Sequence, residues 1–337
     1  MPQANWFPRF RLFLLGVLCV VPSSSLFAQE QPGQFVLTPG VVVDRSANRI
    51  FVVEPSDALA TVALQSNTGE VLWKNESATR PLSISAGHSL MSLGSVDANR
   101  LGVLVLDGDT GKVRAESPLN IPPEAATLAA PLGEGRLDAT AVIRGQRGLL
   151  RWNYTPPVTK QGLPPGTLSG LPNAELIPEV AQPQPALNDN PGGFVEIDLE
   201  TGEQSVVDPA AAPNFAPAND APEQPLLPEI PGPKYLSADG RHVMARERTK
   251  GESHRFMMLV FDKQSGEAIG KFPSNVSYVP FYVDEGRIVL QKEEFAEAID
   301  GQLVKQPRQL QALDLNSGEV IWRQPIAEMK FRGPPPP

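Results

Sequence analysis

Short apolar runs that end at a polar turn recur along the chain. The last copy reads QALDLNSGEVIWRQP, from Gln311 to Pro325. An apolar run of four or five residues is followed by Asp, two variable polar residues, Thr or Ser, and glycine, and a second run begins at once. Runs of this length favour strands, and a glycine that can adopt positive φ suits a tight hairpin turn. Each copy therefore predicts a β-hairpin.

Five copies of this unit can be aligned. Their turn glycines are Gly69, Gly111, Gly202, Gly266 and Gly318. The first strand ends in Gln65 in the first copy and in Asp107, Asp198, Asp262 and Asp314 in the others. An aspartate before a tight turn accepts hydrogen bonds from the N–H groups of that turn. We therefore interpret these aspartates as structural, not as a ring of ligands.

A looser hairpin precedes most copies, as in residues 41–54, 235–248 and 281–293. Two hairpins make four strands, and four antiparallel strands that recur every 40 to 50 residues are typical of propeller blades. The pattern predicts an all-β fold, a β-propeller of four-stranded antiparallel blades. We expect five blades.

A sixth blade is the alternative, because 91 residues separate Gly111 from Gly202. Residues 140–154 could close such a blade, since Gly148 precedes Trp152 by four residues, the spacing that also separates Gly69 from Trp73. The same segment could equally be part of the third blade, followed by a long insertion.

The first residues predict an exported protein. Arg9 and Arg11 precede an apolar run at 12–21, and Ala28 is the expected last residue before cleavage, so residues 1–28 resemble a secretory signal peptide. A retained membrane anchor is the alternative, but ten residues of helix span only about 15 Å, half of a hydrocarbon core. We expect a periplasmic or extracellular location, in a bacterial envelope, with no membrane span after cleavage.

The remaining boundaries follow from proline. The propeller is expected at 29–326, with proline-rich insertions at about 155–193 and 209–233 and a proline-rich tail at 327–337. The segment QFVLTPG (34–40) is expected to close the ring by pairing with the last blade.

Composition excludes several kinds of chemistry. Cys19, inside the first apolar run, is the single cysteine, so the rest of the chain can form no disulfide, thiolate metal site or cysteine nucleophile. Leu18 before it does not suit bacterial lipidation. The formal net charge is -9, which argues against nucleic acid as a partner.

The pattern ALDLNSGEVIW resembles the repeat of the PQQ-like (quinoprotein) β-propellers, which reads roughly A-L-D-x-x-T-G-x-x-x-W. By this resemblance, the tryptophans Trp73, Trp152 and Trp322 would pack between blades. Some members of the family are dehydrogenases that hold pyrroloquinoline quinone and calcium on the propeller axis. Others have lost the cofactor and act as binding platforms, as does the scaffold lipoprotein of the outer-membrane β-barrel assembly machinery.

The chain departs from the dehydrogenases. It has no cysteine pair, it is too short for eight ordinary blades, and no local group of Glu, Asn and Asp suggests calcium. We therefore expect a non-catalytic platform without a cofactor that binds a protein or another envelope component. The first alternative is a PQQ- and calcium-dependent dehydrogenase or a subunit of one. Acids that converge with an Arg or Lys on the axis would favour the enzyme, and small or apolar residues would favour the platform.

Other candidate sites are weaker. No catalytic motif is present, and His88, His242 and His254 are far apart in the sequence, so no metal site is expected. The run EEFAEAID (293–300) is interpreted as a solvated acidic loop. A carbohydrate- or polymer-binding propeller is a further alternative, for which Tyr154, Phe215 and Tyr278 are the candidate aromatics.

Overall fold

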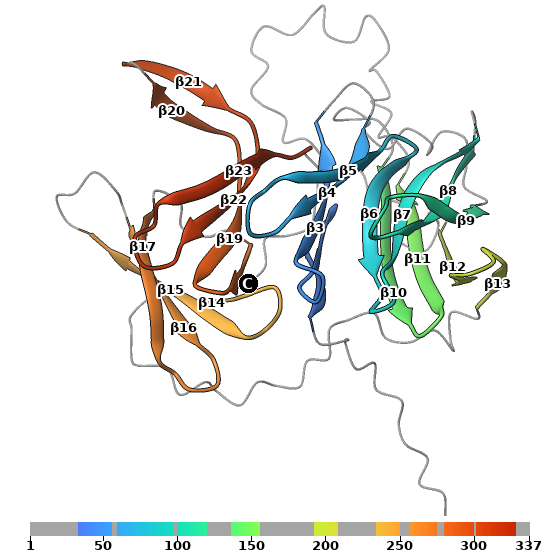
Figure 1. Ribbon diagram of the computed structural model, residues 1–337, viewed down its shortest axis with the longest axis horizontal. Helices are drawn as coiled ribbons and strands as arrows, with labels where there is room; N and C mark the ends of the chain where they lie inside the picture. The colour runs from blue at the N-terminus through green and yellow to red at the C-terminus, as the bar shows by residue number, and fades with distance from the viewer. Residues whose placement is uncertain are drawn as a thin grey trace, which may run out of the picture.

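The computed structural model describes residues 33–55, 59–97, 100–119, 136–155, 192–207, 234–249, 256–274, 280–299 and 301–327. Within these ranges every regular element is a strand, and no helix could cross a membrane (Figure 1). The expected signal peptide, the proline-rich insertions apart from the first one's ends, and most of the tail lie outside the described residues.

The strands form five antiparallel sheets, each from consecutive strands apart from one inserted hairpin. Sheet 1 contains β1 (Gln34–Thr38), β2 (Val41–Asp44), β3 (Arg49–Glu54), β4 (Ala60–Gln65) and β5 (Val71–Asn75). Sheet 2 contains β6 (Ala78–Ile84), β7 (Ser89–Asp97), β8 (Arg100–Asp107) and β9 (Val113–Pro118). Sheet 3 contains β10 (Arg136–Arg144), β11 (Arg147–Thr155), β12 (Gly192–Asp198) and β13 (Gln204–Val206).

Sheet 4 contains β14 (Lys234–Leu236), β15 (His242–Arg248), β16 (Phe256–Asp262) and β17 (Ala268–Ser274). Sheet 5 contains β18 (Phe281–Asp284), β19 (Arg287–Lys292), β22 (Gln309–Asp314) and β23 (Val320–Pro325). A separate hairpin, β20 (Phe295–Ile299) and β21 (Gln302–Gln306), is inserted between β19 and β22. The interpretation of the run 293–300 as a loop is wrong, because most of it forms β20.

The predicted two-hairpin unit is present in each sheet, with a looser inner hairpin and a closing hairpin that carries the repeat glycine. Residues 140–154 lie in β10 and β11, and β11 pairs directly with β12 after the insertion. This segment is part of sheet 3, so it does not close a separate sixth blade.

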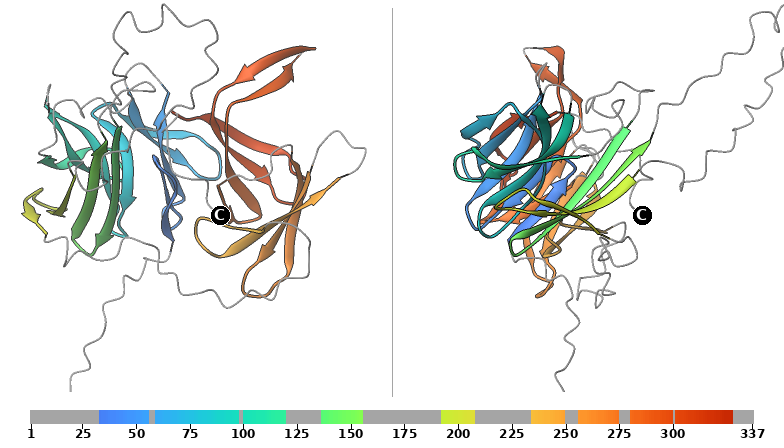
Figure 2. Two further views of the ribbon diagram at one scale, coloured as in Figure 1. Left: turned by 180° about the vertical axis from the view of Figure 1, so that it is seen from behind. Right: turned by 90° about the vertical axis from the view of Figure 1, so that its right-hand side faces the viewer.

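Four hydrophobic clusters join the sheets face to face. One lies between sheets 2 and 3, one between 1 and 2, one between 1 and 5, and one between 4 and 5. The sheets thus follow one another in the order 3-2-1-5-4, with sheets 3 and 4 at the two ends (Figures 1 and 2). Chain order is kept and the first sheet packs against the last, which is the arrangement of a β-propeller.

The N-terminal strand does not pair with the last sheet as predicted. β1 pairs antiparallel with β2 and becomes a fifth strand on the inner edge of sheet 1. It meets sheet 5 through side chains: the ring of Phe35 stands edge-on against Tyr282 at 5.3 Å, and Leu37 is buried in the shared cluster. β1 pairs with β2 because Val41–Asp44 is the next strand in the chain, across a two-residue turn that contains Gly40 at φ +83°.

The repeat glycines lie in turns with positive φ, between +69° and +76°. Four of them also touch the outer strand of the neighbouring sheet. A Cβ atom on Gly69 would lie 2.8 Å from Trp322, and one on Gly111 would lie 2.5 Å from Trp73. Gly202 and Gly318 approach β9 and β17 in the same way. The glycine thus permits both the turn and a close contact between sheets.

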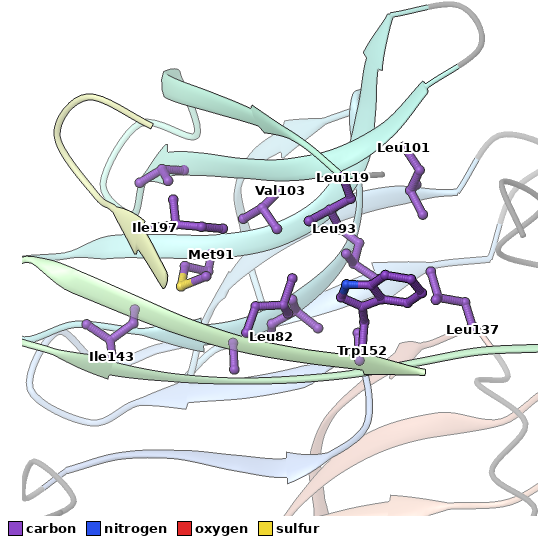
Figure 3. Packing of buried hydrophobic residues seen from close by; sticks show 14 of the residues in the cluster. Leu82, Met91, Leu93, Leu101, Val103, Leu119, Leu137, Ile143, Trp152 and Ile197 are labelled. Atoms are coloured by element: carbon purple, nitrogen blue, oxygen red, sulfur yellow. The ribbon is translucent and has the colours of Figure 1, made fainter. Parts of the chain in front are cut away.

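The three repeat tryptophans lie at sheet junctions. Trp152 is buried between sheets 2 and 3, among Leu93, Leu137 and other apolar side chains (Figure 3). Trp322 is buried between sheets 1 and 5, and its Nε1 donates to the carbonyl of Ser66 at 3.0 Å. Trp73 is half-buried and its Nε1 donates to the carbonyl of Gly108 at 2.9 Å, across the junction of sheets 1 and 2.

Candidate functional site

Each sheet brings its inner turn and its closing turn together. One main-chain hydrogen bond joins the two turns in all five sheets: Ser66 to Asn48, Gly108 to His88, Leu199 to Gln146, Lys263 to Arg241 and Leu315 to Gly286, from N–H to carbonyl at 2.6–2.9 Å. We call the surface formed by these turns the turn face. Because two turns of every sheet are joined in this way, the loops are presented on a rigid scaffold.

The strand-end aspartates stabilise the closing turns. The carboxylate of Asp314 accepts from the N–H groups of Asn316 and Ser317 at 3.0 and 2.8 Å, and Asp107, Asp198 and Asp262 accept in the equivalent way. These N–H donors hold the pKa of Asp198, Asp262 and Asp314 below the usual range of a carboxyl. The aspartates thus bind the N–H groups of their own turns, as the sequence predicted.

A charged cluster lies where the inner turns of three sheets meet. Arg45, in the turn after β2, forms an ion pair with Asp239 of sheet 4 at 2.7 Å and lies 3.8 Å from Asp284 of sheet 5. Its guanidinium also donates to the carbonyl of Val283 and lies over the Tyr282 ring at 5.4 Å. The side chains of Arg45 and Asp239 are only 11% and 5% exposed, so the cluster is an interior feature.

Sheet 2 extends the cluster through His88. His88 has a positive φ of 58° in the turn between β6 and β7. Its Nδ1 lies 3.7 Å from Oδ2 of Asp44 and 3.5 Å from Oδ1 of Asp109. Asp44 is fully buried, and its Oδ1 accepts from the N–H of Ser46 at 3.1 Å. Asp44 and Arg45 are neighbours in the chain, so four sheets contribute to one polar region.

Several buried polar atoms in this region have no hydrogen-bond partner within the described part of the protein. Among the described residues, seven buried side-chain atoms of this region form no hydrogen bond: Gln34 Oε1, Asp44 Oδ2, Arg45 Nε, His88 Nδ1, Asp239 Oδ2, His242 Nδ1 and Tyr282 Oη. Burial lowers the pKa of His242, and burial reinforced by Asp284 raises the pKa of the Tyr282 phenol. In both groups burial disfavours the charged form.

The cluster contains acids together with an arginine, the composition that would favour an enzyme. Its geometry differs from a calcium site. Calcium needs six to eight oxygen ligands around one point, whereas here the guanidinium of Arg45 already lies against Asp239 and near Asp284. No group of three or more His, Cys, Asp or Glu side chains in the described ranges is arranged to hold a metal ion.

Sequence reasoning did not find this cluster, although a signal existed. Asp44 and Asp284 end equivalent inner strands, VVVD and FYVD, and Asp239 stands in the equivalent turn of sheet 4. The repeat of Asp at inner turns could have identified them. Tyr154, which we nominated as a loop aromatic, is instead buried in β11. Phe215, Tyr278 and His254 lie outside the described residues.

Comparisons with known proteins give only weak structural similarities. No family model matches the sequence, and no match to a curated protein was found. Among solved structures, BamB from Moraxella catarrhalis aligns at 11% identity and a TM-score of 0.24, over 82% of this chain and 58% of its own. A europium-containing methanol dehydrogenase aligns at 10% identity and a TM-score of 0.27, over 87% and 52%.

The β-propeller domain of Cps50 (Swd1) from Myceliophteria thermophila aligns at 11% identity and a TM-score of 0.26, over 88% of this chain and 89% of its own. The chain thus spans little more than half the length of the first two proteins. TM-scores this low do not support a fold assignment by themselves. The assignment of a β-propeller therefore rests on the sheets and their packing.

Proposed function

We propose that the protein is a non-catalytic binding platform that holds a protein or another envelope component on its turn face. The observation that carries the proposal is the joining of two turns in every sheet by a main-chain hydrogen bond. The turn tips are exposed, as at Ser46, Arg241 and Glu285, while the strands beneath them are buried. A rigid scaffold with exposed, chemically varied turns is suited to recognising a macromolecular surface.

The location proposed with this function is the bacterial envelope or its exterior. It rests on the signal-peptide pattern of residues 1–28. The acidic net charge of -9 disfavours nucleic acid as the bound component. A protein partner is favoured over a carbohydrate because, of the three aromatics nominated for a sugar site, Tyr154 is buried.

The second candidate is a quinone-dependent dehydrogenase, and one observation favours it. Acids from sheets 4 and 5 converge with Arg45 near the meeting point of the inner turns. As arranged, the two carboxylates are taken up by the arginine and do not fit calcium.

Binding by the turn face can be tested with two charge-swapped variants. Arg241→Glu with Glu285→Arg changes two exposed turn tips, and Glu247→Lys with Lys271→Glu makes the same net change on strands β15 and β17. Each protein is immobilised and exposed to a solubilised envelope extract. A partner retained by the wild type and the strand variant should be lost from the turn variant. Equal retention by all three would exclude the turn face as the binding surface.

The enzyme alternative is tested by thermal melting with calcium, with and without pyrroloquinoline quinone. A ligand at 100 times its dissociation constant adds about 2.7 kcal/mol to the stability of a two-state fold. We expect no shift in Tm. A clear rise with quinone would favour the dehydrogenase and justify a screen of alcohol substrates.

A further inference from the structure

The hairpin β20–β21 stands apart from the five sheets. It forms a two-stranded sheet of its own and extends beyond sheet 5 (Figures 1 and 2). Every residue of β21 except Gln306 is exposed, and Leu303, at 80%, is the most exposed of the large hydrophobic side chains described. An isolated two-stranded hairpin is marginally stable in water, so such an element gains from further strands.

Contacts at the base hold the hairpin in place. The ammonium of Lys292 lies 3.5 Å from the centre of the Phe295 ring, and Glu297 of β20 pairs with Arg323 of β23 at 3.1 Å. Lys305 pairs with Glu294 at 2.7 Å. The bond to Arg323 places β20 on the side of sheet 5, and β21 lies on the side away from β23 (Figure 1). Among the described strands β20 and β21 pair only with each other, and the outer edge of β21 faces away from β23 (Figure 1).

We propose that this edge pairs with the same edge of a second copy of the chain, so that two hairpins form one four-stranded antiparallel sheet. The inference goes beyond the proposed platform function and does not depend on it. A two-fold axis through Val304 would place Gln302 opposite Gln306 and Leu303 opposite Lys305, and each pair would occur twice.

The side chains of β21 suit this register. No like charges stand opposite each other, because the charged Lys305 faces an aliphatic Leu303, and the Val304 side chains meet at the axis. The edge of β20 does not share this property, since the equivalent pairing would place Glu297 opposite Glu297. Two strands of five residues make a small interface, of the size class of weak, transient complexes.

The register makes a specific prediction about charge. Leu303→Lys would set the new lysine opposite Lys305 of the partner at two symmetric positions, and like charges directly opposite destabilise a strand pair. Adding Lys305→Glu would instead set opposite charges against each other. Ile321→Lys, an exposed aliphatic on β23 that is 46% exposed, is the matched control.

The test is sedimentation velocity of the full chain over about 10 to 500 µM, the range of weak association. We expect the wild type and Ile321→Lys to dimerise with concentration, Leu303→Lys to weaken the dimer about tenfold, and Leu303→Lys/Lys305→Glu to restore it. Circular dichroism would verify that each variant is folded. A wild type that stays monomeric throughout the range would refute the proposal. So would a dimer unaffected by Leu303→Lys, which would place the interface elsewhere.

Discussion

Single glycines illustrate how much of the packing depends on one residue. Gly69 and Gly240 both lie in turns with positive φ, at +73° and +70°. A Cβ on Gly69 would meet Trp322 at 2.8 Å, whereas a Cβ on Gly240 would meet no atom within 4 Å. The two positions therefore separate the cost of the backbone conformation from the cost of a clash.

We predict that Gly240→Ala lowers the free energy of unfolding by about 1–2 kcal/mol, the cost of the left-handed conformation. Gly69→Ala should lower it by a further 1–3 kcal/mol or so, because the Trp322 ring must move. Urea denaturation of both variants gives the comparison. Equal losses would mean that the turn of sheet 1 does not press against Trp322.

Trp322 supplies the other side of this contact. Its ring is 7% exposed between sheets 1 and 5. Trp322→Ala should cost about 3–5 kcal/mol, as expected for a large aromatic removed from a core. Trp322→Phe keeps most of the packing but loses the bond to the Ser66 carbonyl, so a loss of about 1–2 kcal/mol is expected. A loss below about 1 kcal/mol for the alanine variant would contradict the burial of this ring.

At the scale of elements, the closing turns make stability depend on pH. Asp198, Asp262 and Asp314 have a lowered pKa because N–H groups of their turns bind the charged form. The folded state then binds fewer protons than the unfolded state near pH 4, so this contribution is present above about pH 4 and is lost as pH falls through the folded pKa.

Replacing these three residues by Asn should therefore flatten the fall of Tm between about pH 5 and pH 2.5, since Asn still accepts hydrogen bonds but does not titrate. The control replaces three exposed neighbours, Glu200, Glu267 and Glu319, by Gln. Scanning calorimetry across this pH range measures both. If the triple Asn variant showed the same slope of Tm against pH as the wild type, the turns would not bind the charged carboxylates.

The elements also show what a sequence can and cannot predict. The closing hairpins could be located because Asp, Thr or Ser, and Gly each act within a few residues of one another, as in Asp314 to Gly318. The strand that pairs with β1 could not be predicted, because an apolar strand fits more than one sheet edge. β20 was missed because its acids hide the strand pattern: Glu297 points toward Arg323, a residue of β23.

The Arg45 cluster was missed for a different reason. Its members come from turns far apart in the sequence and meet only when sheets 1, 4 and 5 are assembled. Neighbouring sheets pack on each other through apolar clusters and short-range hydrogen bonds, so most of the stability is expected to be a sum of local terms. Arg45 is an exception, because it connects sheets 1 and 4 across sheet 5. The cluster therefore reports on the assembly of the whole molecule.

A double-mutant cycle tests this connection. Arg45→Met should cost about 3–5 kcal/mol, because it leaves Asp239 buried without a counter-charge. Asp239→Asn removes that charge, so the double variant should be more stable than the sum of the single losses implies, with a coupling of about 1–3 kcal/mol. The control cycle uses Arg147→Met and Glu196→Gln, an exposed pair within sheet 3, where at most about 1 kcal/mol is expected. Additive losses at Arg45 and Asp239 would mean that sheets 1 and 4 are not joined by this ion pair in solution, and that the inner turns meet in some other arrangement.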